Sequence, residues 1–170
     1  MKDIQTLKFY WLKYEVSDIR EMINNSPGID NFVFTYYFPN TADEDKPIQL
    51  IAYAHMDSKD PVEARYSDYY DTLEVYNSNA LEAGGPLMMS NNILSLNSMQ
   101  ALINSMGPNG DKPEFLVFVP NVNNSGHVYY DIVAYTRRGG EESPLPGNGS
   151  IIDTTNPSPP ATLQEQSAVA

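Results

Sequence analysis

The 170-residue chain contains no cysteine, and this absence excludes several kinds of chemistry at once. Disulfide bonds, thiol nucleophiles and thiolate metal sites all require cysteine. Only two histidines are present, His55 and His127, so imidazole chemistry has few places to occur. A chain without cysteine fits a protein that stays in the cytoplasm, and we predict that location.

Basic residues are also scarce. Ten Lys and Arg stand against 22 Asp and Glu, which gives a formal net charge of −12. Such a chain repels phosphate backbones and anionic lipid surfaces, so we expect neither nucleic acid nor a membrane as a partner. No apolar run is long enough to span a bilayer, and the first residues mix lysine and aspartate with apolar residues, so we expect no signal peptide.

The residues that are abundant indicate a folded, sheet-rich domain. Hydrophobic residues make up 41% of the chain and aromatic residues 11%, with 12 tyrosines against one tryptophan. This composition is too apolar for a disordered chain and favours strands. We therefore expect one domain over residues 1–138, followed by a flexible tail over residues 139–170 that is rich in Pro, Gly and Ser.

Two stretches of the chain share one helical pattern. Residues 15–25 and 95–105 both place apolar residues at intervals of three and four, which predicts two short amphipathic helices. Ser17 and Asn97 occupy matching N-cap positions. Gln100, three residues after Asn97, completes the sequence pattern of a capping box in the second helix.

Each predicted helix is followed by two predicted strands. Residues 32–40 and 113–121 are apolar and aromatic runs that end in Pro-Asn. Residues 48–55 match residues 130–137 at a shift of 82. The loops between the members of each pair predict two β-hairpins.

A weaker match between residues 6–11 and 72–77 adds a strand before each helix. The chain then consists of two β-α-β-β halves, at about residues 5–57 and 71–138. We expect an internally duplicated α+β domain with a mainly antiparallel sheet, both helices on one face, and a pseudo-two-fold axis between the halves.

Strand alternation divides the second strand of each hairpin into two faces. One face is small and apolar and should be covered; it holds Ile48, Leu50, Ala52 and Ala54, matched by Tyr130, Ile132, Ala134 and Thr136. The other face is amphipathic, and we predict that it binds a ligand or a partner through Gln49, Tyr53 and His55, matched by Asp131, Tyr135 and Arg137.

His55 and Asp57 form a His-x-Asp directly after an apolar strand. In a strand these side chains point the same way, which is one arrangement for binding zinc. The segment AHMD resembles the His-x-Asp segment of co-catalytic metallopeptidases of the aminoacylase type. That family also needs a bridging Asp and a Glu-Glu pair, whereas Glu141 and Glu142 lie in the predicted tail. Because the position matched to His55 is Arg137, a poor metal ligand, we expect no metal and no cofactor here.

A third candidate is an acidic, tyrosine-rich segment that contains Tyr66, Tyr69, Tyr70 and Tyr76. Tyrosine supplies a large contact area at low entropic cost and is favoured at protein interfaces. This surface could dock a basic partner, a proline-rich segment such as the chain's own tail, or a second copy. The alternative is that these tyrosines only cover a sheet edge.

These features favour a non-catalytic binding or assembly module that acts through protein–protein contacts, with a homodimer as one form. No residue pattern specifies a small-molecule ligand. Duplicated β-α-β-β units also build small metal-dependent enzymes of the vicinal oxygen chelate type, a likeness of fold alone, in which ligands come from both halves. A third hypothesis is a structural subunit whose hairpins pair edge to edge in a larger assembly.

Overall fold

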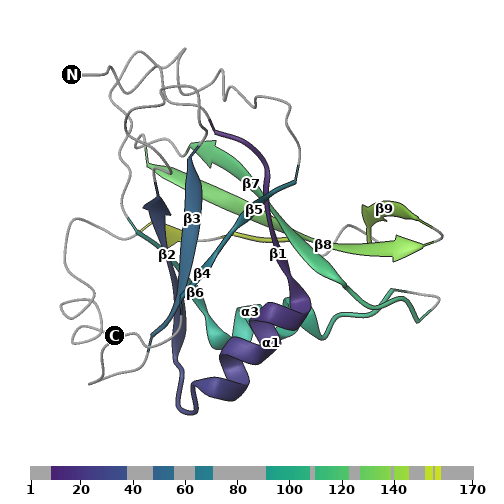
Figure 1. Cartoon of the computed structure of the whole chain (residues 1–170), viewed down its shortest axis with the longest axis horizontal. Helices are drawn as coiled ribbons and strands as arrows, with labels where there is room; N and C mark the ends of the chain where they lie inside the picture. Colours follow the sequence, from purple (N-terminus) through teal and green to yellow (C-terminus); the bar gives the residue numbers. More distant parts are fainter. Residues whose placement is uncertain are drawn as a thin grey trace.

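The computed structural model describes residues 9–37, 48–55, 64–70, 91–107, 110–122, 127–138, 140–145, 152–154 and 156–157. These residues form helices and antiparallel sheets, which confirms the predicted α+β class (Figure 1). In chain order the elements are β1 (Leu12–Glu15), α1 (Val16–Asn25), β2 (Asn31–Tyr37), β3 (Gln49–His55), β4 (Ala64–Tyr66), β5 (Asp68–Tyr69), β6 (Asn92–Ser95), α3 (Leu96–Ile103), β7 (Phe115–Val122), β8 (Val128–Arg138), β9 (Glu141–Pro144), β10 (Ile152–Thr154) and β11 (Asn156–Pro157).

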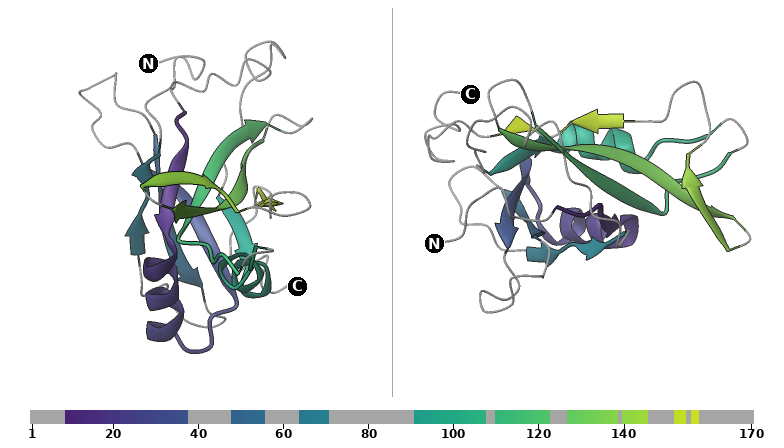
Figure 2. Two further views of the ribbon diagram at one scale, coloured as in Figure 1. Left: turned by 90° about the vertical axis from the view of Figure 1, so that its right-hand side faces the viewer. Right: turned by 90° about the horizontal axis from the view of Figure 1, so that it is seen from above.

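The strands form two sheets rather than the one sheet that the sequence analysis expects (Figures 1 and 2). The β7 sheet has the strand order β10-β8-β7-β1-β5, with β9 also paired to β8. The β2 sheet has the order β11-β6-β2-β3-β4. The named strands pair in antiparallel fashion throughout both sheets.

Two sheets form because the strand before each helix pairs with the hairpin of the other half. β1 leads into α1 but pairs with β7, and β6 leads into α3 but pairs with β2. Each helix therefore carries the chain from one sheet to the other. The helices meet at one end of the sheets (Figure 1), where Arg20 Nη2 donates to the carbonyl of Ile103 at 2.9 Å.

The predicted hairpins are confirmed, and they use equivalent backbone hydrogen bonds in the two halves. The first helical amides, Val16 N and Leu96 N, each donate at 3.0 Å, to the carbonyls of Glu114 and Asp30 respectively. Glu114 N donates to Tyr135 O at 2.8 Å, and Asp30 N donates to His55 O at 2.9 Å. The connectivity and these contacts therefore recur; a common origin of the halves by duplication stays a prediction.

The strands before the helices differ from the prediction. The chain pairs as β1 at Leu12–Glu15 rather than at residues 6–11, and β6 at Asn92–Ser95 precedes the second helix. Residues 72–77 lie outside the described residues. β1 and β6 run directly into their helices, so each strand ends at the N-cap of its helix.

The helix starts are shifted by two residues from the predicted N-caps. Glu15 and Ser95 are the N-cap residues, not Ser17 and Asn97, and only Ser95 caps with its side chain, accepting from Ser98 N at 3.1 Å. The capping box predicted for Gln100 is therefore wrong, because that box counts from Asn97. The strands supply extended backbone up to the N-cap, and this tertiary pairing fixes where each helix begins.

The prediction that Pro-Asn ends both inner strands is wrong for the second hairpin, because β7 continues through Pro120 and Asn121 to Val122. Pro120 pairs with Tyr130 on β8. In an antiparallel ladder the amides alternate between the two neighbours, and the missing N–H of Pro120 falls on the β1 side. The pairing of β1 ends at Leu12 opposite Phe118, so no ladder hydrogen bond is lost.

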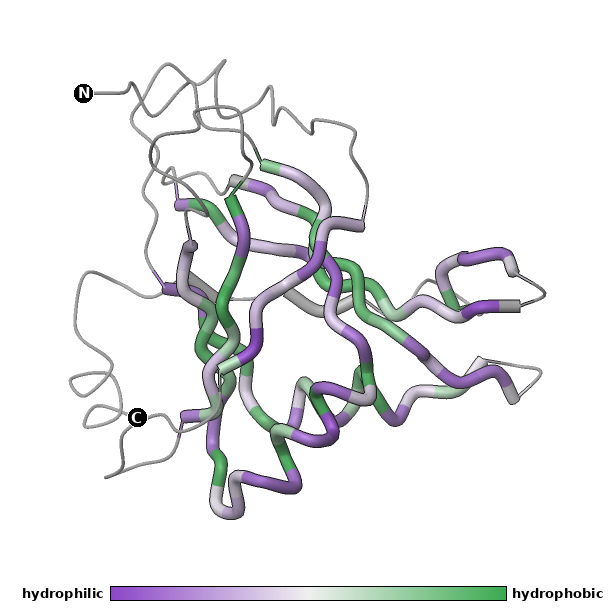
Figure 3. Tube along the Cα trace, viewed as in Figure 1, coloured by the Kyte–Doolittle hydropathy of each residue, from purple (hydrophilic) through white to green (hydrophobic). Residues whose placement is uncertain are grey.

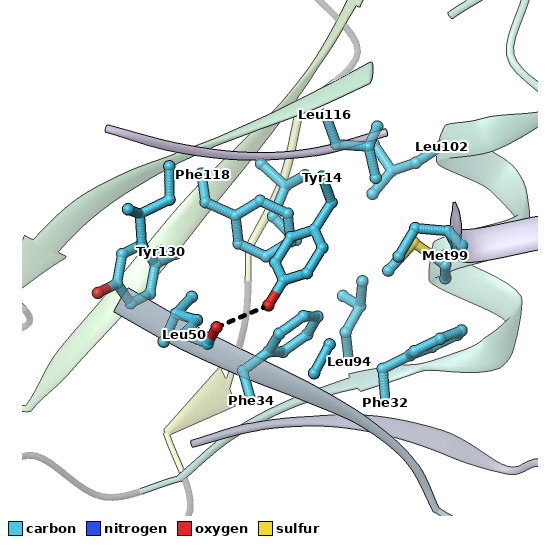
Figure 4. Close-up of a cluster of buried hydrophobic side chains, with 14 of the residues drawn as sticks. Tyr14, Phe32, Phe34, Leu50, Leu94, Met99, Leu102, Leu116, Phe118 and Tyr130 are labelled. Atoms are coloured by element: carbon cyan, nitrogen blue, oxygen red, sulfur yellow. Dashed lines mark hydrogen bonds between the residues drawn. The ribbon is translucent and has the colours of Figure 1, made fainter. Parts of the chain in front are cut away.

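The inner faces of the two sheets share one hydrophobic core (Figures 3 and 4). All the residues predicted for the covered face are buried, and the core that covers them includes residues of the opposite sheet as well as of the helices. Within this core the rings of Phe34 from the β2 sheet and Phe118 from the β7 sheet lie 5.1 Å apart. Burying such aromatic side chains from both sheets is the main favourable term that holds the layers together.

Buried tyrosine hydroxyls connect the layers by hydrogen bonds. The Tyr14 hydroxyl lies 3.1 Å from the Leu50 carbonyl and 3.0 Å from the Arg65 carbonyl, so β1 is tied to β3 and β4 (Figure 4). On the other side, the Tyr36 hydroxyl donates to the Val128 carbonyl at 3.2 Å. Burial raises the pKa of Tyr14 well above its ordinary value of 10.0, which keeps this hydroxyl protonated as a donor.

Two short segments also cross from one sheet to the other. We call residues 64–70, which contain β4 and β5, the first seam, and β10 together with β11 (Ile152–Thr154 and Asn156–Pro157) the second seam. Ser67 forms the corner of the first seam, where its amide donates to Leu50 O at 2.9 Å and its Oγ accepts from Leu50 N at 3.0 Å.

The β-structure extends beyond the boundary predicted at Arg138. Gly140, with a φ of 86°, supports the turn into β9, which pairs with the end of β8. Leu145 is 2% exposed within the main core, and its amide donates to Ala134 O at 2.8 Å. The second seam follows, and residues 158–170 of the predicted tail lie outside the described residues.

Candidate binding surface

The predicted binding residues lie on the outer faces of two different sheets. Because the inner faces share one core, these outer faces point away from each other. Gln49, Tyr53 and His55 are on the β2 sheet, whereas their predicted counterparts on β8 belong to the β7 sheet. The structure therefore does not bring the two sets together.

The backbone equivalence also changes the predicted match by two residues. Asn31 pairs with His55 in one hairpin, and Phe115 pairs with Tyr135 in the other. Since Asp30 and Glu114 make the equivalent hydrogen bonds, His55 corresponds to Tyr135 rather than to Arg137. The repeated Ala-Tyr letters that gave the shift of 82 do not occupy equivalent positions in the two hairpins.

Arg137, predicted as a binding residue, is held by contacts within the chain. Its Nη1 and Nη2 donate to the two carboxylate oxygens of Glu15 at 3.1 and 2.7 Å, and its Nε donates to Glu142 at 3.1 Å. Its guanidinium also lies 4.5 Å from the ring centroid of Phe115. The hydrogen bond from Arg137 lowers the pKa of Glu15 below its ordinary value of 4.5, and the same bond raises the pKa of Arg137.

Tyr135 belongs to a small aromatic cluster on the outer face of the β7 sheet. Phe115 is fully buried in this cluster, and Tyr135 is 9% exposed. The Tyr135 ring lies 5.3 Å from the rings of Phe115 and Tyr70, and Tyr70 stacks on Trp11 at 6.3 Å and 13°. Burial raises the pKa of Tyr135 above its ordinary value of 10.0. Phe115 and Tyr135 are therefore buried within the cluster, whereas Trp11 and Tyr70 are half-buried against them.

Two further predicted binding residues are engaged in hydrogen bonds. Gln49 Nε2 donates to the Ser67 carbonyl at 2.8 Å and so supports the corner of the first seam. Asp131 accepts from Asn121 Nδ2 at 3.3 Å across the β7–β8 hairpin. Both side chains therefore have a structural use in the folded chain.

His55 is buried at the end of β3, with 7% of its surface exposed. Within the described residues its Nδ1 has no hydrogen-bond partner. Asp57, the other half of the predicted His-x-Asp pair, lies outside the described residues. Over the described part of the chain, no group of three or more His, Cys, Asp or Glu side chains is arranged to hold a metal ion.

The tyrosine-rich segment divides between buried and exposed residues. Tyr69 packs against the main core and meets Tyr10 edge to face at 5.7 Å, and Tyr70 belongs to the outer aromatic cluster. Tyr66, by contrast, is 58% exposed. Tyr76 lies outside the described residues.

Tyr66 belongs to an aromatic strip on the outer face of the β2 sheet. Its ring meets that of Tyr37 edge to face at 5.0 Å and 64°, and its Cα partner on β3 is Ile51. Tyr37, Ile51 and Tyr53 are each half-buried. We call Tyr37, Ile51, Tyr53 and Tyr66 the tyrosine strip. The sequence analysis did not single out Tyr37. The run TYYFPN contains two adjacent tyrosines, and the sequence alone did not show that Tyr37 faces outward and Tyr36 inward.

No family model, no curated protein and no solved structure matches the chain. No helix among the described residues is long and apolar enough to cross a membrane. The tyrosine strip must therefore be interpreted from its own chemistry.

Proposed function

We propose that the protein is a non-catalytic binding module that docks a basic partner protein on the tyrosine strip. The observation that carries this proposal is the exposure of Tyr66, which is 58% exposed while most other large apolar residues of the described part of the chain are covered. An aromatic ring held in place by Tyr37 presents contact area with little entropy left to lose on binding.

The contrast between the two outer faces supports this choice of surface. On the β7 sheet Phe115 and Tyr135 are buried, Trp11 and Tyr70 are half-buried, and Arg137 is engaged with Glu15 and Glu142. On the β2 sheet Tyr66 and its half-buried neighbours remain available at the surface. A partner can therefore reach the tyrosine strip without breaking an ion pair.

The charge of the chain supports a basic partner over a second copy. Two copies with a net charge of −12 each repel one another, whereas a basic protein is attracted over a distance set by the ionic strength. This attraction speeds association, and the aromatic contacts then limit dissociation. If the chain instead forms a homodimer through the tyrosine strip, the partner is a second copy and not a basic protein. We keep the cytoplasm as the proposed location, on the absence of cysteine.

The hypothesis of edge-to-edge assembly has less support. β9 is an edge strand that pairs with β8 on one side. Because backbone groups alternate between the two sides of a strand, only the amide of Glu142 and the carbonyls of Glu142 and Pro144 point toward the free side of β9. A proline and paired acidic residues are typical of edges that avoid pairing with another chain.

Photo-crosslinking tests the binding proposal. A photo-reactive phenylalanine analogue is placed at Tyr66 or, as a control, at Met106, which is 61% exposed. In an extract of the source organism we expect a discrete product from position 66 that position 106 does not give. The purified partner should then bind with strongly salt-dependent affinity, and Tyr66→Ala should weaken binding by about tenfold or more while Met106→Ser does not.

Three results would overturn the proposal. The first is the same set of products from positions 66 and 106, and the second is no product from position 66. The third is a product that is the chain itself, confirmed by a dimer in light scattering that Tyr66→Ala converts to a monomer.

A further inference from the structure

We propose that the second seam, Ile152–Thr154 with Asn156–Pro157, occupies a strand-acceptor site that can take the same segment from a second copy of the chain. β10 pairs with Asp131–Val133 of β8, and β11 pairs with Asn92 and Ile93 of β6. The site is thus formed by the neighbouring edges of both sheets. Its occupant in the structure is the chain's own last described segment, and this inference is independent of the tyrosine strip.

Alternation identifies which backbone groups of the site receive the segment. Leu145 N donates to Ala134 O, so the even-numbered residues of β8 direct their amides and carbonyls toward β9 and β10. Ile132, the Cα partner of Asp153, therefore faces the second seam. This pair is a hydrogen-bonded position of the ladder.

The edge of β6 shows the same alternation. Leu96 N donates to Asp30 O on the β2 side, so Ile93 directs its amide and carbonyl to the opposite side, toward Asn156. Pro157 then pairs with Asn92 at a position that needs no amide. A segment that fits this site therefore has a backbone amide at the positions of Asp153 and Asn156, and it can have a proline at the position of Pro157.

The two seams differ in how firmly they are built into the chain. The first seam is fixed in the middle of the sequence by Ser67, by Gln49 and by the Tyr14 hydroxyl. The second seam comes after every other described element, so no described helix or strand follows it in the chain. Its removal exposes unpaired backbone on both edges, which is the condition for binding another extended strand.

The binding test uses a chain that ends at residue 151 and a fluorescent peptide of residues 150–159. We expect saturable binding in fluorescence anisotropy, and binding weaker by about tenfold or more for a peptide that carries Asp153→Pro, which lacks the amide facing Ile132. Equal binding of the two peptides, or no binding by a shortened chain that melts cooperatively, would overturn the proposal.

Cross-linking of full-length chains decides the question if the shortened chain does not fold. Because the protein has no cysteine, a chain with Val133→Cys and a chain with Ile152→Cys carry one thiol each, at positions that are Cα partners. We expect a disulfide-linked heterodimer when they are mixed under mild oxidation. A yield no higher than that of Ile152→Cys mixed with Met106→Cys would show that the segment does not exchange between chains and would overturn the proposal.

Discussion

The guanidinium of Arg137 forms a two-bond ion pair with the carboxylate of Glu15, which lies 122 residues earlier in the chain. This pair joins the end of β8 to the point where β1 becomes α1. It also holds the guanidinium over Phe115. Arg137 therefore supports the junction between the halves of the fold.

Replacing Arg137 should lower stability. The pair is about one-third exposed, so we expect Arg137→Ala to reduce the free energy of unfolding by only about 1–2 kcal/mol, including the lost contact with Phe115. Arg137→Lys keeps the charge but not the two-bond geometry and should give an intermediate loss. Urea denaturation measures both. Glu142→Gln, which touches only the single bond to Nε, is the matched control, and a larger loss for this variant would contradict the assignment.

The pH dependence of stability should report the same pair. The hydrogen bond from Arg137 lowers the pKa of Glu15 in the folded protein below its ordinary value of 4.5. The contribution of Glu15 is then fully present above pH 4.5 and is lost as the pH falls through the lower, folded-state pKa. The difference in unfolding free energy between the native chain and Glu15→Gln should shrink in acid. A difference that stays constant from neutral pH into acid would contradict this pairing.

Much of this fold could be predicted from patterns of residues that are close together in the sequence. The apolar spacing in residues 15–25 and 95–105 located both helices, and alternation placed residues such as Leu50 and Ile132 on the buried face. The hairpins were also predictable, since each connects neighbouring strands in the sequence. These features need no knowledge of distant contacts.

The sheet arrangement could not be predicted in the same way. Nothing in the sequence of β1 says that it pairs with β7, more than 100 residues away, rather than with the nearby β2. Arg137 was predicted to be a polar residue at a strand end that could bind a partner. Its ion pair could not be predicted, because Glu15 is distant in the sequence. The match of His55 to Arg137 was wrong because it was based on the repeated Ala-Tyr sequence. The backbone hydrogen bonds, which only the folded structure shows, match His55 to Tyr135 instead.

Removing the Tyr14 hydroxyl should loosen the contact between the sheets. Tyr14→Phe leaves the carbonyls of Leu50 and Arg65 without this donor, and we expect a loss of about 1–3 kcal/mol in unfolding free energy. Tyr66→Phe removes a hydroxyl from an exposed ring and should change stability by less than about 0.5 kcal/mol. Equal effects of the two substitutions in urea denaturation would contradict a role for the Tyr14 hydroxyl in joining the layers.

The start of the second helix can be tested with two serines. Ser95 accepts a hydrogen bond from Ser98 N, so Ser95→Ala should cost about 1 kcal/mol of unfolding free energy. Ser17, the N-cap predicted from sequence for the first helix, lies inside α1 in the structure, and Ser17→Ala should be neutral or slightly stabilising. Thermal unfolding of both variants distinguishes the structural assignment from the sequence prediction, because the latter requires Ser17→Ala to be the costly change.

Leu145 decides whether the segment after Arg138 is part of the domain. A flexible tail would tolerate any substitution there, but Leu145 is 2% exposed in the main core, so Leu145→Ala should lower the unfolding free energy by about 2–4 kcal/mol. Pro144→Ala, next to it on the exposed surface of β9, should have little effect. Urea denaturation compares the two variants. If both leave the midpoint unchanged, the segment is not docked and the domain ends near Arg138, as the composition alone predicts.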